Sequence, residues 1–218
     1  MSIKKILPSY TLGEELTNSI SHGIGACLSV AALVLCVVRA ATRGTAAGVV
    51  SAAIYGATLV ILYCMSTLYH AITNKTARTV FRVFDHTSIY LLIAGTYTPL
   101  TLVTLKGAMG WTLFGIVWGI AVLGIVLNAI NIEKFKVFSM ISYIVMGWVC
   151  IISIKNIVAN MEKGGLIFLV LGGLLYTGGL IFYALKKYRY MHSVWHFFVL
   201  AGSIMHFFCI YSYVLPVR

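Results

Sequence analysis

The sequence predicts an all-α integral membrane protein, a bundle of seven transmembrane helices with its N-terminus in the cytoplasm and its C-terminus outside. Of the 218 residues, 61% are hydrophobic and only 10% are charged, whereas an ordinary soluble domain is about 45–50% apolar and about 25% charged. Splitting the chain at every Asp, Glu, Lys and Arg leaves seven long charge-free runs of 18 to 31 residues. Because about 20 helical residues cross a hydrocarbon core, each run predicts one crossing.

The runs favour helices over the strands of a closed barrel, because they lack the alternating polarity of barrel strands. The connections are short and no repeat or linker interrupts them, so we expect residues 1–218 to form a single domain. The expected spans, in chain order, are approximately 17–38, 47–72, 84–104, 109–130, 137–155, 165–185 and 193–215.

The start of the first span carries a polar segment. Thr11 and Glu14 fit a T-x-x-E capping box, which predicts a short interfacial helix near residues 11–18 before the first crossing. Glu14 and Glu15 precede the apolar run and are expected to lie outside the spans, as are Glu133 and Glu162. Because this segment is not a purely basic head, we do not expect a cleavable signal peptide.

Proline, glycine and cysteine residues in the runs predict a helix end, close helix packing and buried side chains. Pro99 is expected to kink or end the third helix, because proline cannot donate a backbone hydrogen bond. The G-x-x-x-G spacings at Gly44/Gly48 and Gly115/Gly119 predict close helix packing. The five cysteines all fall in apolar runs without a C-x-x-C pair and predict small buried side chains, not a disulfide framework.

Basic residues set the expected orientation. With the N-terminus in the cytoplasm, ten Lys and Arg residues fall inside and six outside, which favours this orientation and an inner (plasma) membrane location. The inner residues are Lys4, Lys5, Lys75, Arg78, Arg82, Lys134, Lys136, Lys186, Lys187 and Arg189. The outer residues are Arg39, Arg43, Lys106, Lys155, Lys163 and Arg218. Since these charges are scattered between spans, we expect membrane lipids as partners and no nucleic acid.

Histidines converge on the predicted cytoplasmic side. Ionisable groups at membrane depth are costly and are candidates for function. His192 and His196 are four residues apart and share a helix face, and His70 ends the second run on the same side. Three imidazoles from two helices leave a fourth tetrahedral position open, which is typical of catalytic zinc.

Two further residues fit this hypothesis. Asp85 starts the third run on the histidine side and can orient and deprotonate a zinc-bound water. Ser66 lies one turn before His70 and can hydrogen-bond that water or a substrate carbonyl. A proton relay of histidine and aspartate is the competing interpretation.

The other histidines are interpreted as packing or interfacial residues. A single histidine in a membrane span is usually a hydrogen-bonded packing residue or an anchor at the membrane interface. We interpret His22, His86 and His206 in this way. His206 follows His196 by ten residues, about 15 Å along a helix, and so cannot share its metal.

With these residues in place, the chain resembles the hemolysin III proteins, the bacterial branch of the progestin and adipoQ receptor family. The resemblance rests on SHGIG at 21–25, STLYH at 66–70, FDH at 84–86, AGTYTP at 94–99 and HSVWH at 192–196. It implies seven helices, N-in and C-out, and an intramembrane zinc held by His70, His192 and His196, with Asp85 contacting the metal through water and Ser66 in the same site.

The resemblance also bears on activity. The family's animal receptors are similar to membrane hydrolases that include alkaline ceramidases, which implies hydrolysis of a lipid amide or ester, or a lipid-sensing relative of such an enzyme. The family name implies a haemolytic pore-former as an alternative, and a receptor-like protein with a structural zinc is a third. The lipid, protein partners and oligomeric state, including a homo-oligomer, stay open at this point.

Overall fold

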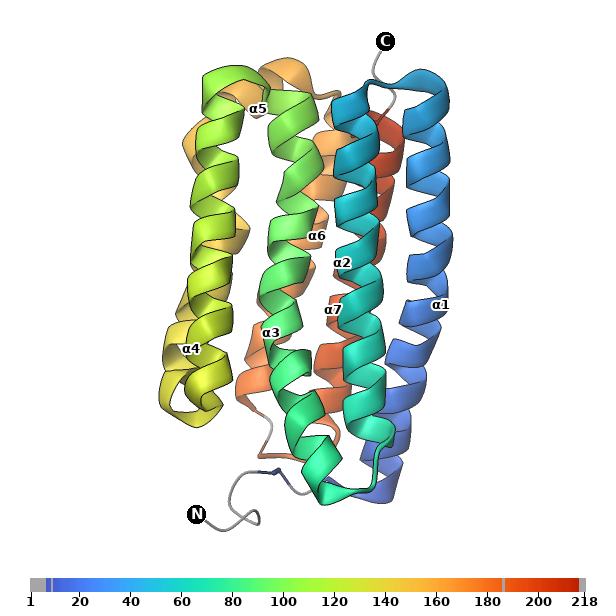
Figure 1. Ribbon diagram of the computed structural model, residues 1–218, viewed down its shortest axis with the longest axis vertical. Helices are drawn as coiled ribbons and strands as arrows, with labels where there is room; N and C mark the ends of the chain where they lie inside the picture. Colours follow the sequence, from blue (N-terminus) through green and yellow to red (C-terminus); the bar gives the residue numbers. More distant parts are fainter. Residues whose placement is uncertain (1–6, 9, 186, 216–218) are drawn as a thin grey trace.

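The computed structural model describes residues 7–8, 10–185 and 187–215, and nearly all of them are helical. The helices stand side by side along one axis (Figure 1). In chain order, the elements are α1 (Leu12–Arg43), α2 (Ala46–Ala71), α3 (Lys75–Pro99), the π-helix η2 (Leu100–Leu105), α4 (Gly107–Trp148), the 3-10 helix η3 (Val149–Ser153), α5 (Ile154–Asn160), α6 (Lys163–Ala184), α7 (Met191–Cys209) and the π-helix η4 (Ile210–Val214).

Six helical stretches in the described residues are long and apolar enough to cross a membrane. One of them, Gly107–Asn160, is 54 residues long and bends back on itself at Asn131, whose φ of −165° and ψ of 99° are not helical. Ser139 donates a hydrogen bond of 2.9 Å to Asn128 across this bend, although eleven residues of straight helix would separate them by about 16 Å. The stretch therefore has two antiparallel arms, which Figure 1 shows meeting at the lower end of α4.

The bundle is apolar on its outside, as lipid requires. On α1, the buried residues recur every three or four positions and are mostly small or polar: Glu14, Asn18, Ser21, His22, Gly25, Ser29, Ala32, Cys36 and Ala40. Large apolar side chains such as Ile24 and Val34 are more than half exposed on the other face. This helix thus turns its polar stripe inward, where neighbouring helices supply partners.

Two helices begin earlier than the hydropathy pattern predicts. The Thr11/Glu14 capping box is confirmed, since Thr11 N donates to Glu14 Oε2 at 2.9 Å and Glu14 N donates to Thr11 Oγ1 at 3.3 Å. The expected separate interfacial helix is wrong, because α1 runs unbroken from Leu12. Likewise α3 starts at Lys75, capped by the side chain of Asn74, and the α-helical part ends at Pro99 as predicted.

The glycine and cysteine predictions had different outcomes. A Cβ placed on Gly115 or Gly119 would touch no atom within 4 Å among the described residues, so the expected packing of this pair is wrong within the chain. All five cysteines are free; Cys36 and Cys209 are buried as expected, whereas Cys27 is exposed. Of the basic residues compared for orientation, Lys4, Lys5, Lys186 and Arg218 lie outside the described residues.

The helices α2 and α3 lie close together at Gly95. A Cβ at this position would overlap the hydroxyl of Thr58, whose side chain is anchored to Tyr55 O at 2.8 Å. Glycine at this position therefore allows the close contact between α2, which carries His70, and α3, which carries Asp85.

We predict that Gly95→Ala lowers the free energy of unfolding by about 1–3 kcal/mol, because the added methyl overpacks this contact. Thermal unfolding in detergent, followed by circular dichroism, measures the change. Gly115→Ala is the matched control and should not destabilise, since its Cβ enters open space. Equal destabilisation by both substitutions would contradict the packing described here.

Candidate metal centre

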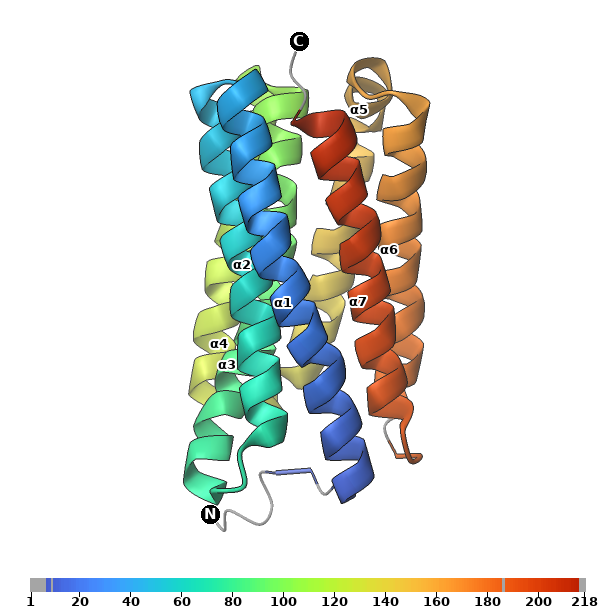
Figure 2. The ribbon, with the colours of Figure 1, turned by 90° about the vertical axis from the view of Figure 1, so that its right-hand side faces the viewer.

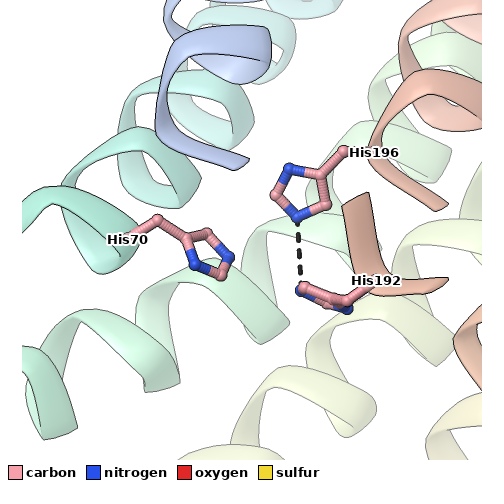
Figure 3. Close-up of side chains that lie close together, drawn as sticks. All are labelled: His70, His192 and His196. Atoms are coloured by element: carbon pink, nitrogen blue, oxygen red, sulfur yellow. Dashed lines mark hydrogen bonds between the residues drawn. The ribbon is translucent and has the colours of Figure 1, made fainter. Parts of the chain in front are cut away.

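Three buried histidines meet at the end of the bundle where α1 begins. His70 is the penultimate residue of α2, while His192 and His196 lie one turn apart at the start of α7. They are only 4%, 6% and 2% exposed, and one ring nitrogen from each lies within 4.8 Å of the others. Figure 3 shows the three rings turned toward a common space. The structure thus brings together the three residues that the sequence selects.

The start of α7 is fixed by a contact from α1. Tyr190 adopts a left-handed backbone conformation, with φ of 62°, immediately before α7. Its backbone N–H donates to Glu14 Oε1 at 2.8 Å. This contact holds the first turn of α7, so that His192 and His196 face the bundle interior and not lipid.

The hydrogen bonds of the rings show which nitrogens are available. His70 Nδ1 lies 2.7 Å from Glu15 Oε2, so Nδ1 carries the hydrogen and donates it. Asn18 Nδ2 is 3.4 Å from the same nitrogen, but an amide N–H cannot donate to an N–H, so we assign the hydrogen bond to Glu15. Among the described residues, His70 Nε2 has no hydrogen-bond partner.

The α7 rings approach each other edge to edge. His192 Nε2 and His196 Nε2 are 3.3 Å apart, which fits a hydrogen bond between opposite tautomers and equally two ligands of one ion. Two nitrogens bound at about 2.0–2.1 Å to a tetrahedral metal lie about 3.3–3.4 Å apart. The Nδ1 atoms of both rings have no hydrogen-bond partner in the described part of the chain.

The triad fits a transition-metal ion. A buried polar atom without a partner costs about 1–3 kcal/mol, so an unpaired histidine nitrogen at this depth indicates a missing partner. Three neutral imidazoles suit zinc, copper, iron or nickel and do not suit magnesium or calcium, which prefer oxygen ligands. His70, His192 and His196 could therefore hold one such ion.

Asp85 and Ser66 line a small pocket beside the triad. The pocket has a volume of about 30 Å³, enough for a water molecule, and its walls include both residues together with His192 and His196. Ser66 Oγ is buried and lies beside the Asp85 carboxylate. Asp85 Oδ2 lies 3.4 Å from His86 Nδ1. Both residues thus lie where the sequence places them, close to the α7 histidines.

The sequence interpretation missed three residues of this site. Glu15, expected outside the spans, lies in the first turn of α1 and contacts His70, so Asp85 is not the single carboxylate near the histidines. Asn18 Oδ1 accepts a hydrogen bond of 2.6 Å from Ser193 Oγ. Tyr10 stacks on His192 with ring centroids 5.1 Å apart, and burial raises the pKa of its hydroxyl, which stays neutral.

The remaining histidines divide into two kinds. His206 Nε2 donates to Leu169 O at 3.2 Å, as the packing interpretation expects. His86 Nδ1 donates to Arg82 O at 3.0 Å, but it also lies 3.4 Å from Asp85, so His86 borders the site. His22 instead stacks on His196, with ring centroids 3.7 Å apart. The spacing of residues 15, 18 and 22 places Glu15, Asn18 and His22 on one face of α1, a signal that the sequence carried.

Fold and site define a multi-pass helical membrane protein with a buried histidine cluster that could bind a metal. A family model described as "Haemolysin-III related" matches residues 10–207, and the chain belongs to this family. It is 45% identical over 203 residues to "Hemolysin-3" of Bacillus cereus, covering 93% of each chain. It is also 45% identical to the "Hemolysin-3 homolog" of Bacillus subtilis (strain 168), over 95% of this chain and 98% of the relative.

A more distant relative extends the family to animals. The "Monocyte to macrophage differentiation factor" of Homo sapiens is 30% identical over 172 residues, which cover 76% of this chain and 71% of that protein. This similarity places the chain with the wider progestin and adipoQ receptor family.

Proposed function

We propose that this chain is a zinc-dependent membrane hydrolase that cleaves an amide or ester bond of a membrane lipid. The observation that carries the proposal is a cluster of three buried imidazoles, two of which, His192 and His196, line one pocket together with a carboxylate and a hydroxyl. Asp85 and Ser66 supply the acid–base and hydrogen-bonding groups that a histidine cluster alone lacks.

Zinc is the ion that we assign to His70, His192 and His196. Three histidines with an open fourth position are the ligand set of catalytic zinc, whereas structural zinc sites are closed by four protein ligands. The described residues around the triad offer no thiolate, since none of the five cysteines belongs to the cluster. Glu15 contacts the outer nitrogen of His70, as carboxylates commonly do behind zinc-bound histidines.

The chain's own residues divide the chemistry. When bound, zinc supplies a Lewis acid for the substrate carbonyl and favours ionisation of water at neutral pH. Asp85 accepts the proton of the attacking water and returns it to the departing nitrogen or oxygen. Ser66 Oγ, which lies beside Asp85 in the pocket, donates a hydrogen bond to the substrate carbonyl. Burial of the pocket keeps bulk water away from these groups.

An apolar cavity beside the site favours a lipid substrate. It lies between α3, α4, α6 and α7, and it shares Leu62, Ile89, Trp195 and Val199 with the pocket that holds Asp85. An acyl chain in this cavity would direct its carbonyl carbon toward the histidines. We therefore propose membrane lipids as partners, entering sideways from the bilayer.

We further propose that the chain crosses the inner (plasma) membrane seven times, with its N-terminus in the cytoplasm. The two arms that meet at Asn131 supply one crossing each. In addition, α1 begins and η4 ends at opposite ends of the bundle (Figure 2), which favours an odd number of crossings. The excess of Lys and Arg on the histidine side favours N-in.

A pore-former is the second candidate, and the names of the two Bacillus relatives favour it. A buried metal site contributes nothing to a pore, however, and a chain built of lipid-facing helices has no soluble form for release. A receptor-like or lipid-sensing protein with a structural zinc is the third candidate, and it differs from the hydrolase in not needing Asp85 as a proton acceptor.

The metal proposal predicts about one zinc per chain in protein purified without chelators. The double variant His192→Ala, His196→Ala should lose it, because only His70 remains. His206→Ala is the matched control and should keep zinc, since His206 bonds to Leu169 and lies outside the triad. Metal analysis by mass spectrometry measures all three proteins. Metal-free wild type, or zinc retained in the double variant, would end this proposal.

The hydrolase proposal predicts that Asp85→Asn keeps most of the zinc but lowers the release of fatty acid from a lipid mixture by at least 100-fold, because the proton acceptor is lost. Lipid profiling by mass spectrometry measures the products. Unchanged lipid turnover in Asp85→Asn would contradict the assigned role. Dye leakage from liposomes that is independent of Asp85 would instead support the pore-former.

The topology proposal predicts that a C-terminal alkaline phosphatase fusion is active outside the cytoplasm of intact bacteria. A green fluorescent protein fused at the same point should stay dark, because it does not fold after export. A bright fluorescent fusion and an inactive phosphatase would place the C-terminus inside and contradict seven crossings with N-in.

A further inference from the structure

The proposed ligands come from two helices that lie far apart in sequence. His70 belongs to the end of α2, whereas His192 and His196 belong to the start of α7. Zinc binding requires these helix ends to be held in register to within a fraction of an ångström. The helix that lies along both is α1 (Figure 2), and one of its faces carries Glu15, Asn18 and His22.

Glu15 controls which nitrogen of His70 is free. Its Oε2 accepts the Nδ1 hydrogen of His70 at 2.7 Å, which leaves the lone pair on Nε2, the nitrogen without a partner among the described residues. The opposite tautomer would carry a hydrogen on Nε2 and could not bind a metal there. A carboxylate at this distance also makes the imidazole a stronger ligand.

Glu15 is itself held from the other side. Its second oxygen, Oε1, pairs with the guanidinium of Arg78 on α3. The side chain of Glu15 is only 12% exposed, and the side chain of His70 is fully covered. The carboxylate therefore has little freedom to rotate away from His70.

The same face of α1 contacts the α7 ligands. Asn18 accepts the hydroxyl hydrogen of Ser193, the residue after His192, at 2.6 Å. His22 stacks on His196 with an angle of 16° between the ring planes. One helix face thus touches both halves of the triad.

We propose that Glu15 is a positioning residue for the metal centre: it holds His70 in the Nδ1–H tautomer, while Asn18 and His22 seat the α7 ligands against it. This inference rests on the proposed metal binding by the triad. It assigns a role to Glu15, which is not one of the three proposed ligands. It also means that α1 must be docked before the site can bind tightly.

A purely structural role for Glu15 is the competing explanation, because the pair with Arg78 joins α1 to α3. Glu133 provides a matched control for it. Its Oε1 pairs with the guanidinium of Arg82 on α3, as Glu15 pairs with Arg78 on the same helix. Replacing either glutamate with glutamine weakens an ion pair to α3, but of the two only Glu15 contacts a proposed ligand.

The test compares Glu15→Gln with Glu133→Gln in the full-length protein in detergent. The zinc dissociation constant is measured by competition with a chromophoric chelator, and the visible absorption of bound Co²⁺ reports ligand geometry. Glu15→Gln should weaken zinc binding about 10–100-fold and shift the Co²⁺ bands, since the orienting carboxylate is lost. Glu133→Gln weakens a comparable ion pair to α3 and should leave both metal readouts unchanged.

Arg78→Gln is a second test of the positioning role of Glu15. It can be used even if Glu15→Gln does not fold. It leaves the Glu15–His70 contact in place but frees the carboxylate on its other side, so zinc affinity should fall several-fold. Wild-type zinc affinity and Co²⁺ spectra in Glu15→Gln, or in Arg78→Gln if only that variant folds, would overturn the positioning role. Wild-type protein that binds no zinc would overturn the underlying metal proposal instead.

Discussion

Imidazole nitrogens buried in a membrane protein need partners, and this constraint organises the end of the bundle where α1 begins. A buried nitrogen that lacks a hydrogen-bond partner or a bound ion is costly. His86 and His206 find backbone carbonyls. His70 satisfies Nδ1 with Glu15 but leaves Nε2 unpaired, and that nitrogen lies close to the α7 rings. A single bound cation would satisfy one nitrogen of each ring at once.

The first helix makes this arrangement possible. Its inward stripe is polar at the histidine end and small farther along, from Gly25 to Ala40. The polar part bonds to α2 through His70, to α3 through Arg78 and to α7 through Ser193. The small part lets the helices approach closely. The same helix therefore packs the bundle and aligns groups from three other helices around one point.

Spacing and chain direction were enough to predict the candidate site. His192 and His196 share a face because they are four residues apart, and counting alternate spans puts His70, Asp85 and Ser66 on their side. Helix starts were predicted less well, because charged residues were taken to end each span. A helix continues past a charge that is paired, as Glu15 is with Arg78 and Arg82 is with Glu133. Glu15 was missed for this reason, and with it the contact to His70.

The glycine spacings show a different limit. Gly95, which has no such motif, lies at a close contact of α2 and α3, whereas a Cβ on Gly115 or Gly119, which have the motif, would meet nothing within 4 Å among the described residues. Spacing identifies a face on which another helix can pack closely, but it does not say which helix lies there. The bend at Asn131 falls between the expected spans 109–130 and 137–155, and its side chain caps the second arm by accepting from Lys134 N at 3.0 Å.

X-ray absorption at the zinc edge of the purified protein tests the central claim, that His70, His192 and His196 hold one ion, most directly. The account predicts a single zinc environment with three imidazole nitrogens at about 2.0–2.1 Å and one oxygen ligand that completes a tetrahedron. A spectrum dominated by sulfur at about 2.3 Å, or by six oxygens, would contradict it, because neither set of ligands is available from the three histidines.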